Sequence, residues 1–161
     1  MTDVYQYLDQ HGIGYRRYDH PAFFTAVEAS AFEEQLPDKG GCCKNLFLTD
    51  EKKLNLFLVV LPSLKKANLK ELTRTLGTKN LSFASPALLL EHMGVTPGSV
   101  SLLGLINDTN HRVQVILDAD LWQSDTIYLH PNINTATLAI ARADIEKLLH
   151  VWGNPYRVLS L

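Results

Sequence analysis

The chain reads Gly40-Gly41-Cys42-Cys43-Lys44-Asn45-Leu46-Phe47-Leu48 where a predicted strand enters the core. Two glycines open this stretch and three apolar residues close it, but Lys44 and Asn45 interrupt it. A strand that is buried on one face alternates apolar and polar side chains. Two adjacent polar residues therefore mean that one of them points inward, unless the strand bulges or begins at Asn45.

Two roles for Lys44 are consistent with this position. A structural lysine lays its methylene stem on the core and keeps its ammonium in water. A functional lysine at the rim of a pocket offers an electrophilic contact to a carbonyl or phosphate oxygen. Structural lysines outnumber functional ones, so this stretch alone favours the structural role.

Apolar periodicity predicts one α/β domain that spans residues 1–161. Strands are expected at 15–18, 46–48, 54–60, 113–117, 126–129, 135–140 and 156–159. Helices are expected at 2–11, 25–35, 68–77, 85–94 and 142–150. Because strands and helices are intermixed without a strict βαβ rhythm, we expect a mixed central sheet wrapped by helices. The strand at 54–60 is apolar on both faces, so it should be central and form a hairpin with 46–48.

Four of the predicted helices begin at side chains that cap helices well: Thr2, Thr25, Asn68 and Ser85. An oxygen at this position accepts a hydrogen bond from a free backbone N–H group of the first turn. Glu28 and Glu71 follow two of these caps at a spacing of three residues, which is a capping-box pattern. Gly94 ends the helix that Ser85 begins.

Composition excludes several broad classes of protein. With 161 residues, of which 46% are hydrophobic and 20% charged, the chain can bury a sizeable core. The net charge of −2 does not suit non-specific binding of nucleic acid, so any such contact requires a local basic patch. The N-terminal residues lack the layout of a signal peptide, and no apolar run approaches the length of a membrane span. We therefore expect cytoplasmic residence and neither a membrane nor a DNA partner.

One basic patch follows the predicted hairpin. Lys66, Lys70 and Arg74 stand four residues apart and would line one helix face. A solvated helix face is the more common explanation for this spacing. Contact with the phosphates of a nucleic acid is the alternative.

The two cysteines, Cys42 and Cys43, are neighbours in the sequence. Adjacent cysteines form a disulfide only with strained geometry, and this stretch offers too few ligands for a metal site. We expect two reduced thiols in a reducing compartment. A nucleophilic Cys43, activated by the cation of Lys44, is a weaker alternative because no histidine lies nearby in the sequence.

Two loops have the composition of binding loops. In the loop 94–101, Gly98 allows backbone conformations that are closed to other residues, and exposed N–H groups could bind a carbonyl or a phosphate. A helix C-cap followed by a proline turn explains the same residues. The loop 130–135 begins with His130 at a strand end, where the imidazole could act near neutral pH or simply donate a hydrogen bond.

Five segments, in this order, resemble the YbaK/prolyl-tRNA-synthetase-associated editing domains, and within that family the free-standing prolyl-tRNA editing proteins most closely. They are residues 41–48, 81–86, 96–101, 104–108 and 130–138. The resemblance covers nearly the whole chain. It implies a mixed α/β domain and a hydrolase, without metal or other cofactor, that removes alanine from mischarged tRNA(Pro).

The resemblance also implies roles for the residues of the polar strand. Activity would depend on Lys44, with Asn45 beside it in the pocket. Cys43 keeps its place before the lysine. Cys42 departs from the family pattern, in which a small residue is expected at this position.

Other site residues are implied in the same way. The loop that contains Gly94, Gly98 and Ser99 would shape the aminoacyl site together with His130. Thr25 belongs to a segment that lines the pocket in the family. These five residues are expected to bind substrate.

The implied roles agree with the chemistry of error correction. A site that holds proline cannot fully exclude the smaller alanine, since missing methylenes give only about 1–3 kcal/mol of discrimination. An aminoacyl ester is already activated, so a hydrolase mainly positions it and stabilises the developing oxyanion. Lys44 could hold the ester carbonyl or the terminal phosphate, and a ribose hydroxyl of the substrate could activate the attacking water.

Two alternatives stay open. The same fold could prefer cysteinyl-tRNA(Pro), because the sequence does not determine the pocket volume. The chain could also be a catalytically idle module that binds tRNA or a synthetase. The expected partners are mischarged tRNA(Pro), contacted by the basic patch, and prolyl-tRNA synthetase.

Overall fold

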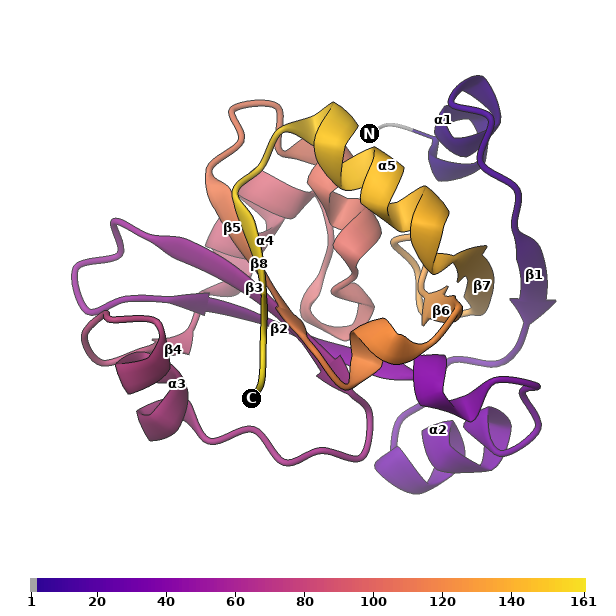
Figure 1. Cartoon of the computed structure of the whole chain (residues 1–161), viewed down its shortest axis with the longest axis horizontal. Coiled ribbons are helices and arrows are strands. Elements are labelled where there is room, and N and C mark those ends of the chain that lie inside the picture. Colours follow the sequence, from indigo (N-terminus) through magenta and orange to yellow (C-terminus); the bar gives the residue numbers. More distant parts are fainter. Residues whose placement is uncertain (1–2) are drawn as a thin grey trace.

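The computed structural model describes residues 3–161. Across this range the strands are β1 Arg16–Asp19, β2 Cys43–Thr49, β3 Leu56–Pro62, β4 Ser82–Phe83, β5 Val113–Asp118, β6 Thr126–Leu129, β7 Ala136–Ala141 and β8 Tyr156–Leu159. They form a five-stranded sheet, in the order β4-β2-β3-β5-β8, and a three-stranded sheet, in the order β1-β7-β6. Figure 1 shows the larger sheet with its covering helices.

The helices are α1 Val4–Gln10, α2 Ala26–Glu33, α3 Leu69–Thr75, α4 Pro86–Met93 and α5 Arg142–Trp152. Capping by Thr25, Asn68 and Ser85 is as predicted, because each side chain accepts a backbone N–H of the first turn. The predicted cap Thr2 lies outside the described residues, and the carboxylate of Asp3 caps α1. None of the helices within residues 3–161 has the length and apolar character needed to cross a bilayer.

The larger sheet is mixed, which confirms the predicted class of fold. β2 and β3 form the predicted antiparallel hairpin, whereas β3–β5 and β5–β8 are parallel pairs. β3 lies in the centre of the sheet and all its residues from 56 to 61 are buried. The short strand β4 was not predicted, because two exposed residues form no periodic pattern.

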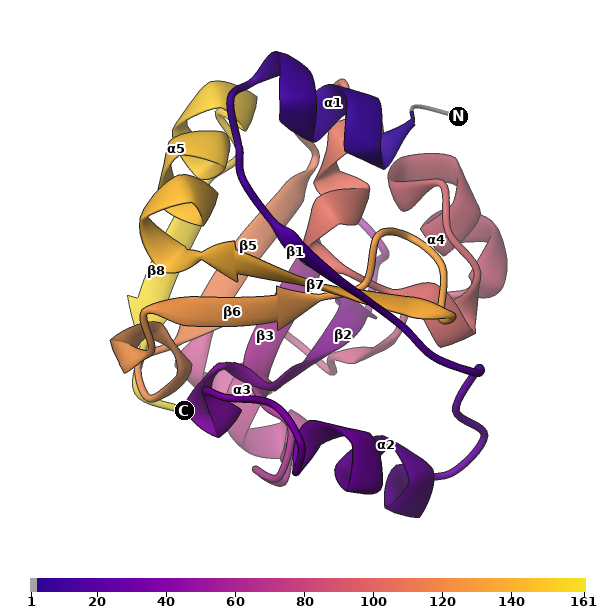
Figure 2. The ribbon, with the colours of Figure 1, turned by 90° about the vertical axis from the view of Figure 1, so that its right-hand side faces the viewer.

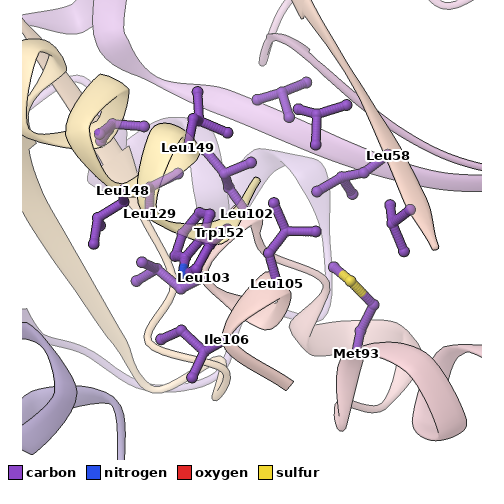
Figure 3. Close-up of a cluster of buried hydrophobic side chains, with 14 of the residues drawn as sticks. Leu58, Met93, Leu102, Leu103, Leu105, Ile106, Leu129, Leu148, Leu149 and Trp152 are labelled. Carbon is purple, nitrogen blue, oxygen red and sulfur yellow. The ribbon is translucent and has the colours of Figure 1, made fainter. Parts of the chain in front are cut away.

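The two sheets face each other across the main core. In Figure 2 the three-stranded sheet lies in front of the larger sheet and its strands cross those behind it. Figure 3 shows the apolar side chains in the core, which include Met93 of α4, Trp152 of α5 and the leucines of the 3-10 segment Leu102–Asn107. A second apolar cluster, on the other face of the larger sheet, packs Leu72 of α3 against Phe57 of β3.

A close backbone contact joins the two sheets directly before β2. Cys42 pairs with Tyr128 of β6 in an isolated parallel bridge. Gly41 is buried beside it, and a Cβ atom added there would collide with the backbone carbonyl of Thr126. Only glycine permits this approach without moving one of the two backbones.

We therefore expect Gly41→Ala to destabilise the protein by about 1–3 kcal/mol, because an added methyl must push β6 away from the start of β2. Chemical denaturation of the two proteins measures this difference. Gly40→Ala is the matched control, since the Cβ atom there would meet the side-chain hydroxyl of Ser124 at 2.7 Å, a group that can rotate away. Equal stability of Gly41→Ala and the parent protein would contradict the proposed contact.

Candidate active site

Strand β2 places Lys44 and Asn45 on opposite faces. Its register with β3 is continuous from Cys43 to Thr49, so the strand contains no bulge. Asn45 shares its face with Cys43 and Phe47, and Phe47 belongs to the main core. Asn45 is therefore the inward-pointing polar residue that the sequence required.

A cleft of about 370 Å³ opens beside this part of β2. Lys44 and Asn45 line it together with Gly98 and His130, and helix α2 forms one of its walls. β4 pairs with β2 only at Leu48 and Thr49, so it does not cover the strand edge near Lys44. The cleft thus brings together four of the residues predicted for the site.

Lys44 is half-buried and lines this cleft. Among residues 3–161, no carboxylate lies within 4.0 Å of its ammonium to form an ion pair. A cation at a cleft that has no counter-ion from the protein attracts an anionic or strongly polar ligand. Lys44 is therefore available to a carbonyl or phosphate oxygen that enters the cleft.

A smaller pocket of about 60 Å³ adjoins the cleft. The two hollows share Ala29, Glu33, Cys43, Asn45 and His130 as lining residues. The rings of Phe23, Phe32 and Tyr128 form much of its apolar wall. Since about 10–15 Å³ of such volume holds one water molecule, the pocket has room for a group of only a few non-hydrogen atoms.

The wall at His130 is held in one arrangement by hydrogen bonds. Nδ1 of His130 lies 3.1 Å from the backbone carbonyl of Ala136, which can only accept, so Nδ1 carries the proton. Burial lowers the pKa of His130 and is the largest cause. The hydrogen bond to Ala136 raises this pKa, and the nearby His20 lowers it. The neutral ring leaves Nε2 as an acceptor. His20 stacks on Phe23 with ring centroids 4.4 Å apart.

The thiols beside the pocket are protonated. Burial is the main cause that raises the pKa of Cys42 and of Cys43 to about 12 each. Cys43 donates its hydrogen to the backbone carbonyl of Tyr128 at 3.3 Å. This pKa does not favour the alternative in which Lys44 activates Cys43, because burial raises the pKa of the thiol and Lys44 lies on the opposite face of β2.

Three other predicted site residues lie elsewhere. Thr25 caps α2. Its hydroxyl accepts the backbone N–H of Glu28 and donates to the carboxylate of Glu28, and Thr25 does not line the cleft. Gly94 and Ser99 line a separate open hollow. Gly98 and Ser99 face different hollows because residues 97–99 form one turn of 3-10 helix, in which successive residues point in different directions.

The basic patch also differs from its prediction. Asn68 caps α3, so Lys66 precedes the helix and only Lys70 and Arg74 share a helical face. All three side chains are exposed. Their neighbour Lys65 is neutralised by Asp118 and Asp120, each at 2.7 Å.

Three polar residues of the cleft, Ser30, Glu33 and Ser63, were not predicted from the sequence. Glu33 is the last residue of α2, and Ser63 follows β3 directly. Both line the cleft, and the hydroxyl of Ser63 donates to the carboxylate of Glu33 at 2.7 Å. A glutamate near a helix end and a serine after a strand are too common to have been singled out.

The known proteins that are similar to this chain have related descriptions. A model of the family described as "Aminoacyl-tRNA editing domain" matches residues 20–148. The chain is 34% identical to the prolyl-tRNA editing protein ProX of Acetoanaerobium sticklandii, over 96% of this chain and 93% of that protein. It is 37% identical to the prolyl-tRNA synthetase associated domain-containing protein 1 of Danio rerio, over 88% of this chain and 77% of that protein.

A solved structure agrees with these relatives in fold. It is described as a candidate trans-editing enzyme for prolyl-tRNA synthetase, and it superimposes with a TM-score of 0.70 at 22% identity, over 99% of this chain and 95% of the other. The match confirms the YbaK-like α/β fold. Taken with the family model and the curated relatives, it means that this chain belongs to the aminoacyl-tRNA editing domain family.

Proposed function

We propose that this protein is a trans-editing hydrolase that deacylates mischarged alanyl-tRNA(Pro), and that residues 1–161 form its deacylase domain. Membership of the editing family supports the reaction class. The observation that carries the proposal is Lys44, a half-buried residue with no ion pair among residues 3–161, in a cleft that adjoins a pocket of about 60 Å³. This arrangement suits a short acyl group attached to a large anionic carrier.

The reaction needs positioning and charge stabilisation more than a strong base. Water attacks the ester carbon, the bond to the ribose oxygen breaks, and alanine and free tRNA(Pro) leave. Lys44 holds the developing oxyanion or the terminal phosphate. Asn45 and the backbone around Gly98 contact the aminoacyl group, and a ribose hydroxyl of the tRNA activates the water.

The pocket volume supports a small amino acid. A methyl group fits a space of about 60 Å³ among aromatic rings more readily than a proline ring does. The side chain of cysteine is larger than that of alanine by one non-hydrogen atom, so cysteinyl-tRNA(Pro) is the second candidate substrate. Prolyl-tRNA synthetase, which generates such errors, is the expected source of the substrate.

Lys44→Ala should lower the rate of alanyl-tRNA(Pro) deacylation by about 100-fold or more, the usual cost of removing a group that stabilises an oxyanion. Release of labelled amino acid from alanyl-, cysteinyl- and prolyl-tRNA(Pro) measures the rate and the specificity together. Alanyl-tRNA(Pro) should be the best substrate and prolyl-tRNA(Pro) the poorest.

Lys147→Ala is the matched control for that experiment, because Lys147 is an exposed lysine on α5 and does not line the cleft. It should retain the parent rate. If the parent protein binds alanyl-tRNA(Pro) but hydrolyses it no faster than Lys44→Ala, the protein is an idle binding module.

Alkylation tests the remaining covalent alternative. Since burial raises the pKa of both thiols to about 12, less than one thiol in a thousand is ionised at pH 8. Iodoacetamide at pH 7–8 should therefore leave deacylation unchanged over the time in which it modifies free cysteine. Rapid inactivation, matched by labelling of Cys43, would indicate a thiol nucleophile instead.

The exposed cations near α3 are proposed to contact the tRNA backbone. Replacing Lys66, Lys70 and Arg74 together by glutamine should raise KM for alanyl-tRNA(Pro) and leave kcat nearly unchanged. The slope of log KM against log salt should fall by about 2–3, since each phosphate contact contributes about 0.7–0.9 to it. An unchanged slope would remove these residues from the interface.

A further inference from the structure

Glu33 occupies the junction between the two hollows of the site. It ends helix α2, its side chain is half-buried, and it lines both the cleft and the small pocket. Nothing in the chemistry described so far uses a carboxylate at this place. A partly buried carboxylate is costly unless a cation or several donors satisfy it.

The carboxylate of Glu33 is only partly satisfied by the protein. The hydroxyl of Ser63 donates to one oxygen at 2.7 Å, and the protonated thiol of Cys42 also interacts with this carboxylate. Within the described chain, no lysine, arginine or histidine nitrogen lies within 4.0 Å of it, whereas the adjacent Glu34 pairs with Lys39 at 2.7 Å in solvent. A carboxylate offers about four acceptor positions, so Glu33 still has positions left for a ligand.

A second acceptor lies on the same wall. The side-chain oxygen of Asn45 is buried and has no hydrogen-bond donor among residues 3–161. Asn45 lines both hollows, as Glu33 does. A buried acceptor without a donor is rare in folded proteins and commonly marks a site that a ligand completes.

Together these two groups describe the missing ligand chemically. Both are acceptors and one is an anion, so they suit a cationic group with several N–H donors, such as a primary ammonium. Lys44 lines the same cleft but is more than 4.0 Å from Glu33, so the site keeps a cation and an anion apart. An aminoacyl ester has this pattern, with an α-ammonium one carbon away from the ester carbonyl.

We propose that Glu33 binds the α-ammonium of the aminoacyl ester, with the side-chain oxygen of Asn45 as a second acceptor. This inference rests on the proposed function and adds a determinant of specificity to it. With the methyl group in the small pocket and the carbonyl near Lys44, the ammonium lies at the junction that Glu33 lines. Esters whose α-nitrogen is acylated, as in peptidyl-tRNA, have neither this charge nor its three donors and are spared.

The test compares alanyl-tRNA(Pro) with lactyl-tRNA(Pro), whose α-hydroxyl replaces the ammonium while the methyl group and the ester stay the same. At about pH 6.5 the α-amine is protonated. The parent protein should prefer the alanyl ester in kcat/KM. Glu33→Gln should reduce that preference by about 10- to 100-fold, the usual value of a hydrogen bond to a charged group, and should leave the lactyl rate within about threefold.

Glu34→Gln is the matched control, because Glu34 follows directly in the sequence, is exposed and lines neither hollow. It should keep the parent preference. Glu33→Asp keeps the charge and should retain more of the preference than Glu33→Gln. A structural role of Glu33 would slow both esters equally and leave their ratio unchanged.

Three outcomes overturn the inference. The first is a parent protein that hydrolyses the alanyl and the lactyl ester equally well. The second is a Glu33→Gln variant that keeps the parent preference for the alanyl ester. In both cases, turnover that still depends on Lys44 leaves the proposed function standing. If the parent protein fails to deacylate alanyl-tRNA(Pro) at all, the proposed function falls and this inference falls with it.

Discussion

The site depends on one close contact between two backbones. Gly41 lies against the carbonyl of Thr126, and Cys42 pairs with Tyr128 in the next step of the chain. This contact fixes the start of β2 beside the end of β6. As a result, the polar residues of β2 and the histidine that follows β6 line the same cleft, although they are far apart in the sequence. A side chain at position 41 would separate the two sheets where the pocket forms.

The electrostatics of the site are set by two charged side chains that the protein itself does not neutralise. Elsewhere in the described structure some half-buried charges are paired, as Lys65 is with Asp118 and Asp120. In the cleft, Lys44 and Glu33 are both half-buried and form no ion pair with any described residue. Such groups weaken the isolated fold, because desolvation is not offset by a partner. In the proposed function the substrate supplies both partners, an oxygen of the ester or phosphate for Lys44 and the α-ammonium for Glu33. The unpaired charges that reduce stability would thus also select the substrate.

Local signals in the sequence were sufficient for the helices and for most strands. The caps at Thr25, Asn68 and Ser85 form hydrogen bonds within the first turn, so the residues next to them determine the structure. The same signal at Asn68 should have limited the basic stripe, because a helix that begins after residue 68 cannot contain Lys66. β4 could not be predicted, since two exposed residues acquire their strand form only by pairing with the end of β2.

The sequence alone determined the order of most elements, and the order of its motifs was enough to indicate the editing family. The order of the elements depends on periodicity and on neighbouring residues, and the motifs are read along the chain, so both are present before the chain folds. The tertiary structure decided which member of the pair Lys44 and Asn45 faces inward, which residues of the Gly94–Ser99 region reach the cleft, and that Glu33 stands at its junction with the small pocket. The physical reason is that burial, pKa and cavity shape arise from contacts between distant segments, and these exist only after the two sheets have packed together.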